Sequence, residues 1–348
     1  MHKYLSEKAK SLTPYAAGIQ PQEPGWIKLN TNENPYPPSP QVSEAIHNVD
    51  ITQLRLYPDG DSNILCQYIS AHLDVSADHI FAANSSDEVL AFAFGGFFSG
   101  KTNVMTPDIS YGFYPVWAEM YDAGTTIQPL QMDYTVDPAD YKGADGVILA
   151  NPNAPTGIAL TLDEIETIIQ QNPDGAVIVD EAYIDFAAVE SAVRLVEKYE
   201  NLLVIRTFSK SHSLAGLRVG YAVGQPHLID GLQRMKNAFN SYPLDMLAQM
   251  AAAAAISDRA YWDGTRNRII QTREQIAHRL CELGHSSLPS QTNFLFIRAE
   301  RAKALYDFLL ERKILVRYWN KPRLDQFLRV TIGTDEEMEA FLSCVKQF

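Results

Sequence analysis

Cysteine is scarce in this sequence, with three residues among 348. Cys66, Cys281 and Cys344 lie far apart, and none belongs to a CxxC pair. Small secreted domains depend on disulfide bonds, and structural zinc sites use closely spaced cysteine pairs. We therefore expect a reduced, cytoplasmic protein without a disulfide framework and without a metal site.

Positive charge is also in short supply, because 29 Lys and Arg residues stand against 42 Asp and Glu residues, a formal net charge of −13. A surface that binds nucleic acid or an anionic membrane needs an excess of cations. We expect neither a nucleic-acid partner nor a membrane partner. Any anionic small molecule must instead meet cations that the fold gathers locally.

Long hydrophobic runs are missing as well. The longest, Val89–Phe98, contains glycines and is shorter than the roughly 20 residues that a membrane-spanning helix needs. We interpret it as a buried helix. Met1–Leu5 lacks the apolar core of a signal peptide, which agrees with a cytoplasmic location.

From about residue 50 to residue 245, short apolar runs alternate with stretches of helical spacing. The runs Gly146–Ala150, Ala176–Val179 and Leu202–Ile205 are typical of strands, whereas Thr161–Gln171 and Glu190–Tyr199 between them are typical of helices. This alternation predicts an α/β fold with a mostly parallel central sheet flanked by helices. Ligand-binding groups are expected at the carboxyl ends of its strands.

The pattern changes beyond residue 245. An alanine-rich helix is expected at Met246–Ile256, followed by strand candidates Phe294–Ile297 and Leu328–Ile332. We predict three segments. Residues 1–45 form an N-terminal arm and part of a small domain, residues 46–245 form a large ligand-binding domain, and residues 246–348 complete a small α+β domain.

Lys210 follows the apolar run Leu202–Ile205, lies between two serines, and precedes Arg218 by eight residues. A lysine at the end of a buried strand, with hydroxyl groups and a fixed cation nearby, suits Schiff-base chemistry on a phosphorylated cofactor. A solvated lysine would show the same local pattern, so the companions of Lys210 decide the interpretation.

Asp180 is the first companion, because it ends the apolar run that begins at Ala176. A carboxylate at the end of a buried strand needs a cation, and the protonated ring nitrogen of a pyridine cofactor is one. Tyr183 is close enough in sequence to reach the phenolic side of the same ring. A metal-binding or helix-capping carboxylate is the alternative.

A phosphate group needs neutral donors and a cation. Ser85, Ser86 and Asp87 follow an apolar run and open a helix, where free N–H groups and hydroxyls bind anions, although a serine there can also be a simple N-cap. Ser209, Ser211 and Arg218 would complete this phosphate site.

Two further residues are expected at the sheet edge formed by the carboxyl ends of the strands. Asn153 lies in the turn Asn151–Gly157, which prolines and a glycine make rigid, and it could present its amide to a ligand. Tyr111 could stack on a ring face, although an aromatic residue at such a position packs into the core more often.

In these motifs the chain resembles the fold-type I pyridoxal-phosphate aminotransferases, and within them most closely the histidinol-phosphate aminotransferases. The likeness covers nearly the whole sequence, and the order and spacing of the motifs agree. The matching motifs are Leu12–Tyr15, Leu29–Tyr36, Tyr57–Gly60, Asp180–Tyr183, Ser209–Lys210, Leu214–Arg218, Thr292–Phe294 and Leu328–Gly333.

The resemblance implies pyridoxal 5'-phosphate as cofactor, bound covalently by Lys210, which later moves a proton. It implies that Asp180 pairs with the ring nitrogen, that Tyr183 binds the phenolate oxygen and that Tyr111 stacks on the ring. The phosphate would be held by Ser85, Ser86, Ser209 and Arg218, and Asp87 is expected among the cofactor-binding residues. The family also implies a homodimer with shared active sites, in which Tyr57 reaches the partner's cofactor phosphate.

One position departs from the family. An asparagine usually precedes Pro-Thr-Gly and donates to the phenolate oxygen, but this chain has Ala154 there. Either Asn153 replaces the missing amide through a shift of the turn, or Tyr183 serves alone.

Two arginines of the C-terminal segment suggest the substrate. Arg317 and Arg329 resemble a pair that binds the anionic end of the substrate, and guanidinium groups suit carboxylates and phosphates alike. The family likeness adds Asn32, and Tyr15 from the neighbouring subunit. Arg317 could instead be a solvated cation at a sheet edge.

These features predict transamination of histidinol phosphate with 2-oxoglutarate, which gives imidazole-acetol phosphate and glutamate in histidine biosynthesis. An aromatic or broad-specificity aminotransferase and a threonine-phosphate decarboxylase are alternatives within the superfamily. A binding protein that keeps the cofactor without turnover is an alternative of another class. A nucleotide-binding protein is disfavoured, because neither GxGxxG nor a Walker loop is present.

Overall fold

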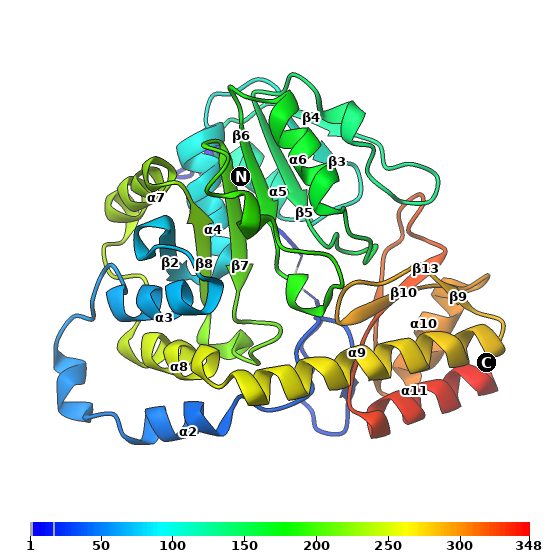
Figure 1. Ribbon diagram of the computed structural model, residues 1–348. Coiled ribbons are helices and arrows are strands. Elements are labelled where there is room, and N and C mark those ends of the chain that lie inside the picture. The colour runs from blue at the N-terminus through cyan, green and yellow to red at the C-terminus, as the bar shows by residue number, and fades with distance from the viewer. Residues whose placement is uncertain (1–2, 17) are drawn as a thin grey trace.

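The computed structural model describes residues 3–16 and 18–348, and a seven-stranded sheet forms its centre (Figure 1). Strand β8 runs antiparallel to both of its neighbours, and the other adjacent strands are parallel, which confirms the predicted mostly parallel α/β sheet. In spatial order the strands are β2 (Ile80–Asn84), β8 (Val219–Gly224), β7 (Leu202–Thr207), β6 (Ala176–Asp180), β5 (Gly146–Ala150), β3 (Val104–Pro107) and β4 (Thr125–Gln128).

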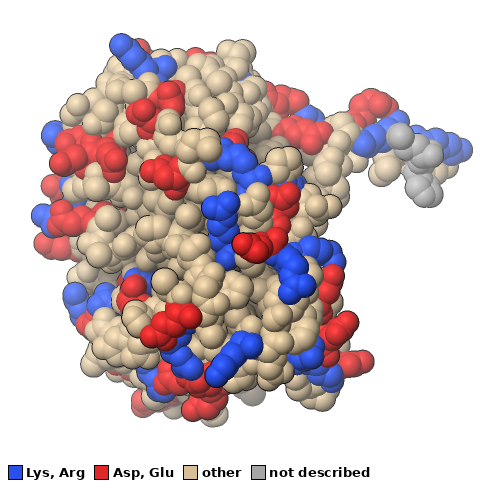
Figure 2. All heavy atoms as spheres, turned by 90° about the vertical axis from the view of Figure 1, so that its right-hand side faces the viewer, with Lys and Arg blue, Asp and Glu red and all other residues tan. Residues whose placement is uncertain are grey.

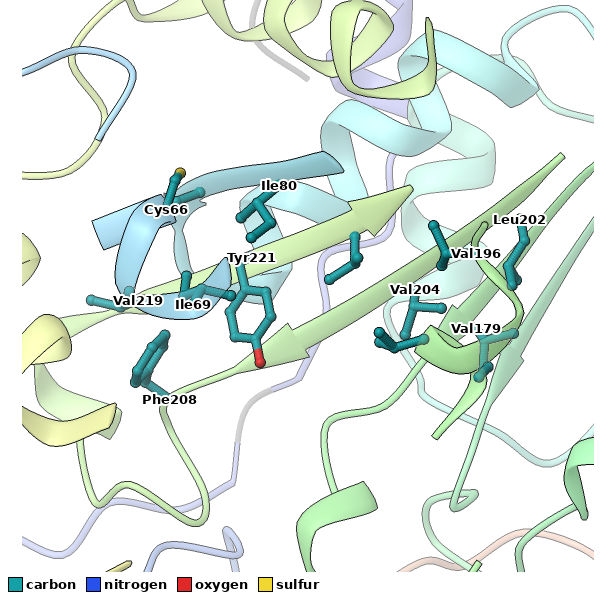
Figure 3. Packing of buried hydrophobic residues seen from close by; sticks show 14 of the residues in the cluster. Cys66, Ile69, Ile80, Val179, Val196, Leu202, Val204, Phe208, Val219 and Tyr221 are labelled. Carbon is teal, nitrogen blue, oxygen red and sulfur yellow. The ribbon is translucent and has the colours of Figure 1, made fainter. Parts of the chain in front are cut away.

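Helices cover both faces of this sheet, because successive side chains of its strands point to opposite sides. In β6, Val177 and Val179 enter the core on one face, part of which Figure 3 shows, and Ile178 enters the core on the other. The first face is covered by α3 (Asn63–Leu73), α6 (Leu162–Gln171) and α8 (Met246–Ser257). The second is covered by α4 (Ser85–Ala93), α5 (Tyr114–Met120) and α7 (Pro226–Phe239).

A smaller antiparallel sheet lies in the C-terminal part, in the order β12 (Arg317–Tyr318), β13 (Phe327–Thr331), β10 (Phe294–Arg298) and β9 (Ser286–Ser287). A separate core lies between this sheet and the helices α9 (Arg259–Glu282), α10 (Ala302–Glu311) and α11 (Asp335–Gln347). The N-terminal segment joins this part, because β1 (Ile27–Lys28) pairs in parallel with β11 (Ile314–Leu315). Two short helices also lie in the N-terminal segment, α1 (Glu7–Ser11) and α2 (Pro40–His47), and Val42 of α2 packs into the core of the large sheet.

The division at residues 45 and 245 stays a prediction, but the packing bears on the second boundary. The buried alanines of α8, among them Ala248 and Ala251, belong to the core of the large sheet. A boundary after α8, near Asp258, would therefore keep that core in one piece.

The helix expected at Glu190–Tyr199 is wrong, because the segment forms only a short 3₁₀ turn at Ala192–Leu195. The buried carboxylate of Glu181 accepts hydrogen bonds from the Ser191 hydroxyl at 2.5 Å and from the Ala192 N–H at 2.6 Å. These contacts with a distant residue bind the start of the segment and override its helical spacing.

On the face shown in Figure 2, acidic and basic side chains lie interspersed. Across residues 3–16 and 18–348, no helix combines the length and the apolar character that crossing a membrane requires.

Candidate active site

The carboxyl ends of β5, β6 and β7 meet at one edge of the large sheet, where an inner cavity opens. Most of the residues predicted for the cofactor line it. They are Ser86, Asp87, Tyr111, Asp180, Tyr183, Ser209, Lys210 and Arg218. The cavity is completed by Ala150, Ala154, Ala182 and Thr207.

Asp180 ends β6 and is 5% exposed. One carboxylate oxygen accepts the Tyr114 hydroxyl at 2.8 Å, and the other accepts the Ala182 N–H at 3.2 Å. Burial raises the pKa of Asp180 to about 6, although these two hydrogen bonds oppose the rise. Within the described part of the chain Asp180 has no salt-bridge partner, so it is a buried carboxylate that can take a cation from a ligand.

Lys210 lies on the turn after β7, with its amine at the inner cavity. The Nζ atom donates to the Thr31 carbonyl at 3.3 Å and lies 5.6 Å from the centre of the Tyr183 ring. The Asn34 side chain donates to the carbonyls of Lys210 and Ser211, both at 3.1 Å. The backbone that carries the amine is therefore fixed by the N-terminal segment.

Ser211, predicted for the phosphate site, points elsewhere. Its hydroxyl donates to Asp185, which also pairs with the buried guanidinium of Arg206. Although burial works in the opposite direction, Arg206 holds the pKa of Asp185 below its usual value. This contact joins the turn after β6 to the turn after β7, which carries Lys210. The phosphate assignment of Ser211 is therefore wrong.

The opposite end of the cavity lies at the start of α4. Arg218 pairs with Asp87 at 2.8 Å, and the Tyr111 hydroxyl donates to the same carboxylate at 2.9 Å. A Cβ atom on Gly220 would lie 2.1 Å from the backbone nitrogen of Ser86, so only glycine allows β8 to pass this closely. Ser86, Ser209 and Arg218 thus surround a space with donors and one cation.

Ser85 lies beside this space but does not line it. Its hydroxyl accepts the Asp87 N–H at 3.2 Å and is buried. The structure therefore gives Ser85 the alternative role considered for it, a side-chain hydrogen bond within the first turn of the helix.

Asn153 is not brought to the cavity either. Its amide nitrogen donates to the Ile109 carbonyl and to the Thr156 hydroxyl, both at 3.0 Å, and its oxygen accepts the Ser110 hydroxyl at 2.9 Å. The methyl group of Ala154 faces the cavity instead. In this geometry Asn153 does not replace the family's amide, because its amide is used by Ile109 and Ser110 of the loop after β3 and by Thr156 of its own loop.

A wider cavity continues from the inner one and shares Tyr111, Ala154, Tyr183 and Lys210 with it. Asn32 lines it, and the Asn32 side chain donates to the Tyr183 hydroxyl at 2.8 Å.

Arg329 lines the same cavity and donates to the Asn30 carbonyl at 2.8 Å. Its Nε atom is buried and has no hydrogen-bond partner in the described part of the chain. Burial lowers the pKa of Arg329 from its usual value. A half-buried arginine whose Nε donor is unused within the described residues can bind an anion.

Three residues that were predicted to bind substrate or cofactor do not lie where they were expected. Arg317 faces Arg329 across β12 and β13, but it donates to the Ala16 carbonyl at 3.3 Å and does not line either cavity. Tyr15, expected from a neighbouring subunit, lines the wider cavity of its own chain and stacks on Phe113 at 4.4 Å. Tyr57 is 81% exposed and lies outside both cavities.

A comparison with protein families matches residues 24–345 to the aminotransferases of class I and II. The chain belongs to this family. It is 48% identical to a histidinol-phosphate aminotransferase of Brachyspira hyodysenteriae, with 99% of both chains covered. It is 50% identical to histidinol-phosphate aminotransferase 1 of Bordetella parapertussis, over 100% of this chain and 99% of the other. Such identity over the full length places it among the histidinol-phosphate aminotransferases.

Solved structures agree with this fold. A putative histidinol-phosphate aminotransferase of Erwinia carotovora superposes with a TM-score of 0.86 at 27% identity, covering 93% of this chain and 96% of that one. The Sinorhizobium meliloti histidinol-phosphate aminotransferase, solved in complex with pyridoxal-5'-phosphate, gives a TM-score of 0.90 at 22% identity, covering 100% and 98%.

Several residues of this aminotransferase's site were not anticipated from its sequence. They include Tyr114, which binds Asp180, and Asn34, which holds the lysine turn. Asn34 stands in the Asn-rich motif that carries Asn32, so its motif was a usable signal. Tyr114 lies 66 residues from Asp180 in sequence, and nothing in its surroundings marks it.

Proposed function

We propose that this aminotransferase transfers the amino group of histidinol phosphate to 2-oxoglutarate with pyridoxal 5'-phosphate as cofactor. The products would be imidazole-acetol phosphate and glutamate, in histidine biosynthesis. The observation that carries the proposal is that Lys210 lines the same cavity as Asp180, a buried carboxylate that has no salt-bridge partner among residues 3–16 and 18–348. The names of the full-length relatives support the substrate.

The residues present fit the cofactor. Asp180 can take the charge of the ring nitrogen, and the cavity extends to the start of α4, where a phosphate can lie. In this arrangement Tyr183 would bind the phenolic oxygen and Tyr111 would cover a ring face. The phosphate would be held by Ser86, Ser209 and Arg218. When bound, the cofactor supplies a ring that accepts electrons from the α-carbon of the substrate.

The protein's own groups then handle the proton. When its amine is neutral, Lys210 can take the proton from the α-carbon of the substrate through its Nζ atom. The same atom can then deliver a proton to the C4′ carbon of the cofactor, on the other side of the transferred nitrogen. The hydrogen bonds from Asn34 keep its turn in place. In the cofactor-free protein Asp180 has a pKa of about 6, so at neutral pH it is ionised and can hold the ring nitrogen in its protonated form.

Arg329 is the group that we assign to the anionic end of the substrate. Its Nε atom, which has no partner among the residues that the structure describes, is an available donor, and its guanidinium lies 5.3 Å from the Trp319 ring and 5.2 Å from the Phe294 ring. One guanidinium can bind the phosphate of histidinol phosphate and the carboxylate of glutamate in turn. Arg317, directly across the strands, would add charge without direct contact.

A substrate panel tests this function. Purified protein loaded with pyridoxal 5'-phosphate would be offered histidinol phosphate, phenylalanine and threonine phosphate at one concentration of 2-oxoglutarate. We expect glutamate to form fastest with histidinol phosphate. Faster turnover of phenylalanine would indicate an aromatic aminotransferase, and release of carbon dioxide from threonine phosphate would indicate a decarboxylase. No turnover with any donor would refute the proposal.

We also propose that the protein is a cytoplasmic homodimer with shared active sites. Around Tyr57 the surface is unusually apolar, and Tyr57 stacks on Tyr242 at 4.7 Å. Exposed apolar side chains on the neighbouring elements would be covered by a second copy. They are Ile51, Leu54, Leu56, Ile64 and Phe239.

Hybrid dimers test the sharing of sites. A homodimer of Tyr57→Ala lacks the tyrosine at both of its sites, and a homodimer of Lys210→Ala lacks the lysine at both. If Tyr57 serves the partner's site, a mixture reassociated after subunit exchange contains hybrids with one complete site, about a quarter of the wild-type sites. A mixture with no more activity than its components would show that Tyr57 does not act across the dimer.

A further inference from the structure

One short segment supplies phenolic donors to two carboxylates of the inner cavity. The Tyr111 hydroxyl donates to Asp87 at the phosphate end, and the Tyr114 hydroxyl donates to Asp180 at the opposite end. The two tyrosines lie three residues apart, where the loop after β3 enters α5. Their rings meet edge to face, with centroids 5.6 Å apart.

The Tyr114 side chain is held firmly. It is 2% exposed, and its ring lies against Phe94, with centroids 6.4 Å apart, in the core on the second face of the sheet. Its hydroxyl is therefore a fixed donor aimed at one oxygen of Asp180. The Ala182 N–H fixes the other oxygen, so the orientation of the carboxylate is set by two donors from different elements.

Both of these donors are neutral. A cationic partner would stabilise the carboxylate but would also cancel its charge, whereas a phenol and an amide stabilise it and leave its charge for a ligand. The other groups that face Asp180 oppose each other, since Asp87 raises its pKa and Lys210 lowers it. Burial is the largest influence, and it favours protonation.

We propose that Tyr114 is a positioning residue of the transamination, whose hydroxyl orients Asp180 and keeps it anionic for the protonated ring nitrogen of the cofactor. This inference rests on the proposed function. It assigns to Tyr114 an effect that acts only through Asp180, so its consequences should appear in cofactor binding and should depend on pH.

Tyr114→Phe tests the inference, because it removes the hydroxyl and keeps the ring. Cofactor affinity would be measured by fluorescence titration of cofactor-free protein from pH 5 to pH 9. Hydrogen bonds to charged groups are worth about one to two pH units of carboxyl pKa, so the acid limb of the affinity profile should move up by roughly that amount. At pH 7 the variant should bind pyridoxal 5'-phosphate roughly two- to tenfold more weakly, because the ionised fraction of Asp180 falls with the rise in its pKa.

A cofactor analogue separates this effect from a general loss of structure. In 1-deazapyridoxal 5'-phosphate a C–H replaces the ring nitrogen, so the analogue presents no cation to Asp180. The wild type and Tyr114→Phe should bind the analogue equally well. Tyr141→Phe is the matched control, because Tyr141 is equally buried in the core on the other face, and it should change neither profile.

Two results would overturn the inference. The acid limb of Tyr114→Phe could coincide with that of the wild type, or the variant could lose the same factor of affinity for the analogue as for the cofactor. If the wild type itself fails to bind pyridoxal 5'-phosphate, the proposed function fails together with this inference. Normal cofactor binding by the wild type with an unmoved variant profile would refute the role of Tyr114 alone.

Discussion

Replacing the carboxylate that should bind the cofactor is predicted to stabilise the cofactor-free protein at high pH. Asp180 is buried without a cation among the described residues, and burial raises its pKa from 3.8 to about 6. A raised carboxyl pKa gives a stability contribution that is present below pH 3.8 and is lost as the pH rises through about 6. The amide introduced by Asp180→Asn carries no charge, so this variant escapes the loss.

The magnitude follows from the two pKa values. Moving a carboxyl pKa from 3.8 to about 6 corresponds to about 3 kcal/mol of free energy. The amide can keep both contacts, because its oxygen accepts the Ala182 N–H and its nitrogen can donate to the phenolic oxygen of Tyr114. Relative to the wild type, the free energy of unfolding of Asp180→Asn should therefore rise by about 2.5 kcal/mol between pH 4 and pH 8, because the carboxyl of the unfolded chain is already partly ionised at pH 4.

Urea unfolding of both cofactor-free proteins at several pH values measures this difference. Asp50→Asn is the control, because the hydrogen bond from the Thr52 hydroxyl lowers the pKa of the exposed Asp50, and its contribution is lost only below pH 4. A difference for Asp180→Asn that stays constant with pH would refute the reasoning. So would a wild type that gains on the variant as the pH rises, since that would show a cation already paired with Asp180.

Three other substitutions test contacts in the two cavities and beside them. Arg329→Ala should raise the KM for histidinol phosphate and for glutamate together, by roughly ten- to a hundredfold, because it removes a charge-assisted contact that both anions use. Initial-rate kinetics with each substrate would measure the two KM values, and an effect on only one of them would disprove the shared site. Ser211→Ala should lower the free energy of unfolding by about 1–3 kcal/mol, because Asp185 loses a buried donor, and should leave cofactor affinity unchanged. Ser209→Ala should instead weaken cofactor binding. Urea unfolding and cofactor titration would measure these effects, and a loss of cofactor affinity in Ser211→Ala would return Ser211 to the phosphate site.

The sequence was most informative where a local pattern coincides with a structural need. The apolar runs that end at Ala150 and Asp180 became β5 and β6 because central strands are buried on both faces. The ends of β6 and β7 then brought Asp180 and Lys210 to one cavity. Family likeness supplied residues such as Arg329, which stand in ordinary surroundings.

The failures have a common cause, which is contact between residues distant in sequence. Glu181 captures Ser191 and Ala192 and prevents a helix whose spacing was favourable. Asp185 turns Ser211 away from the cavity, and Ile109 satisfies the Asn153 amide. Each competing partner lies at least ten residues away, so no local pattern reveals it.

The central claim is that Lys210 binds the cofactor covalently beside Asp180. Protein incubated with pyridoxal 5'-phosphate, reduced with borohydride and digested would be mapped by mass spectrometry, which requires no turnover. We predict the mass of a reduced phosphopyridoxyl group on the peptide that contains Lys210, and its absence from Lys210→Ala. The adduct on another lysine, or on none, would contradict the account.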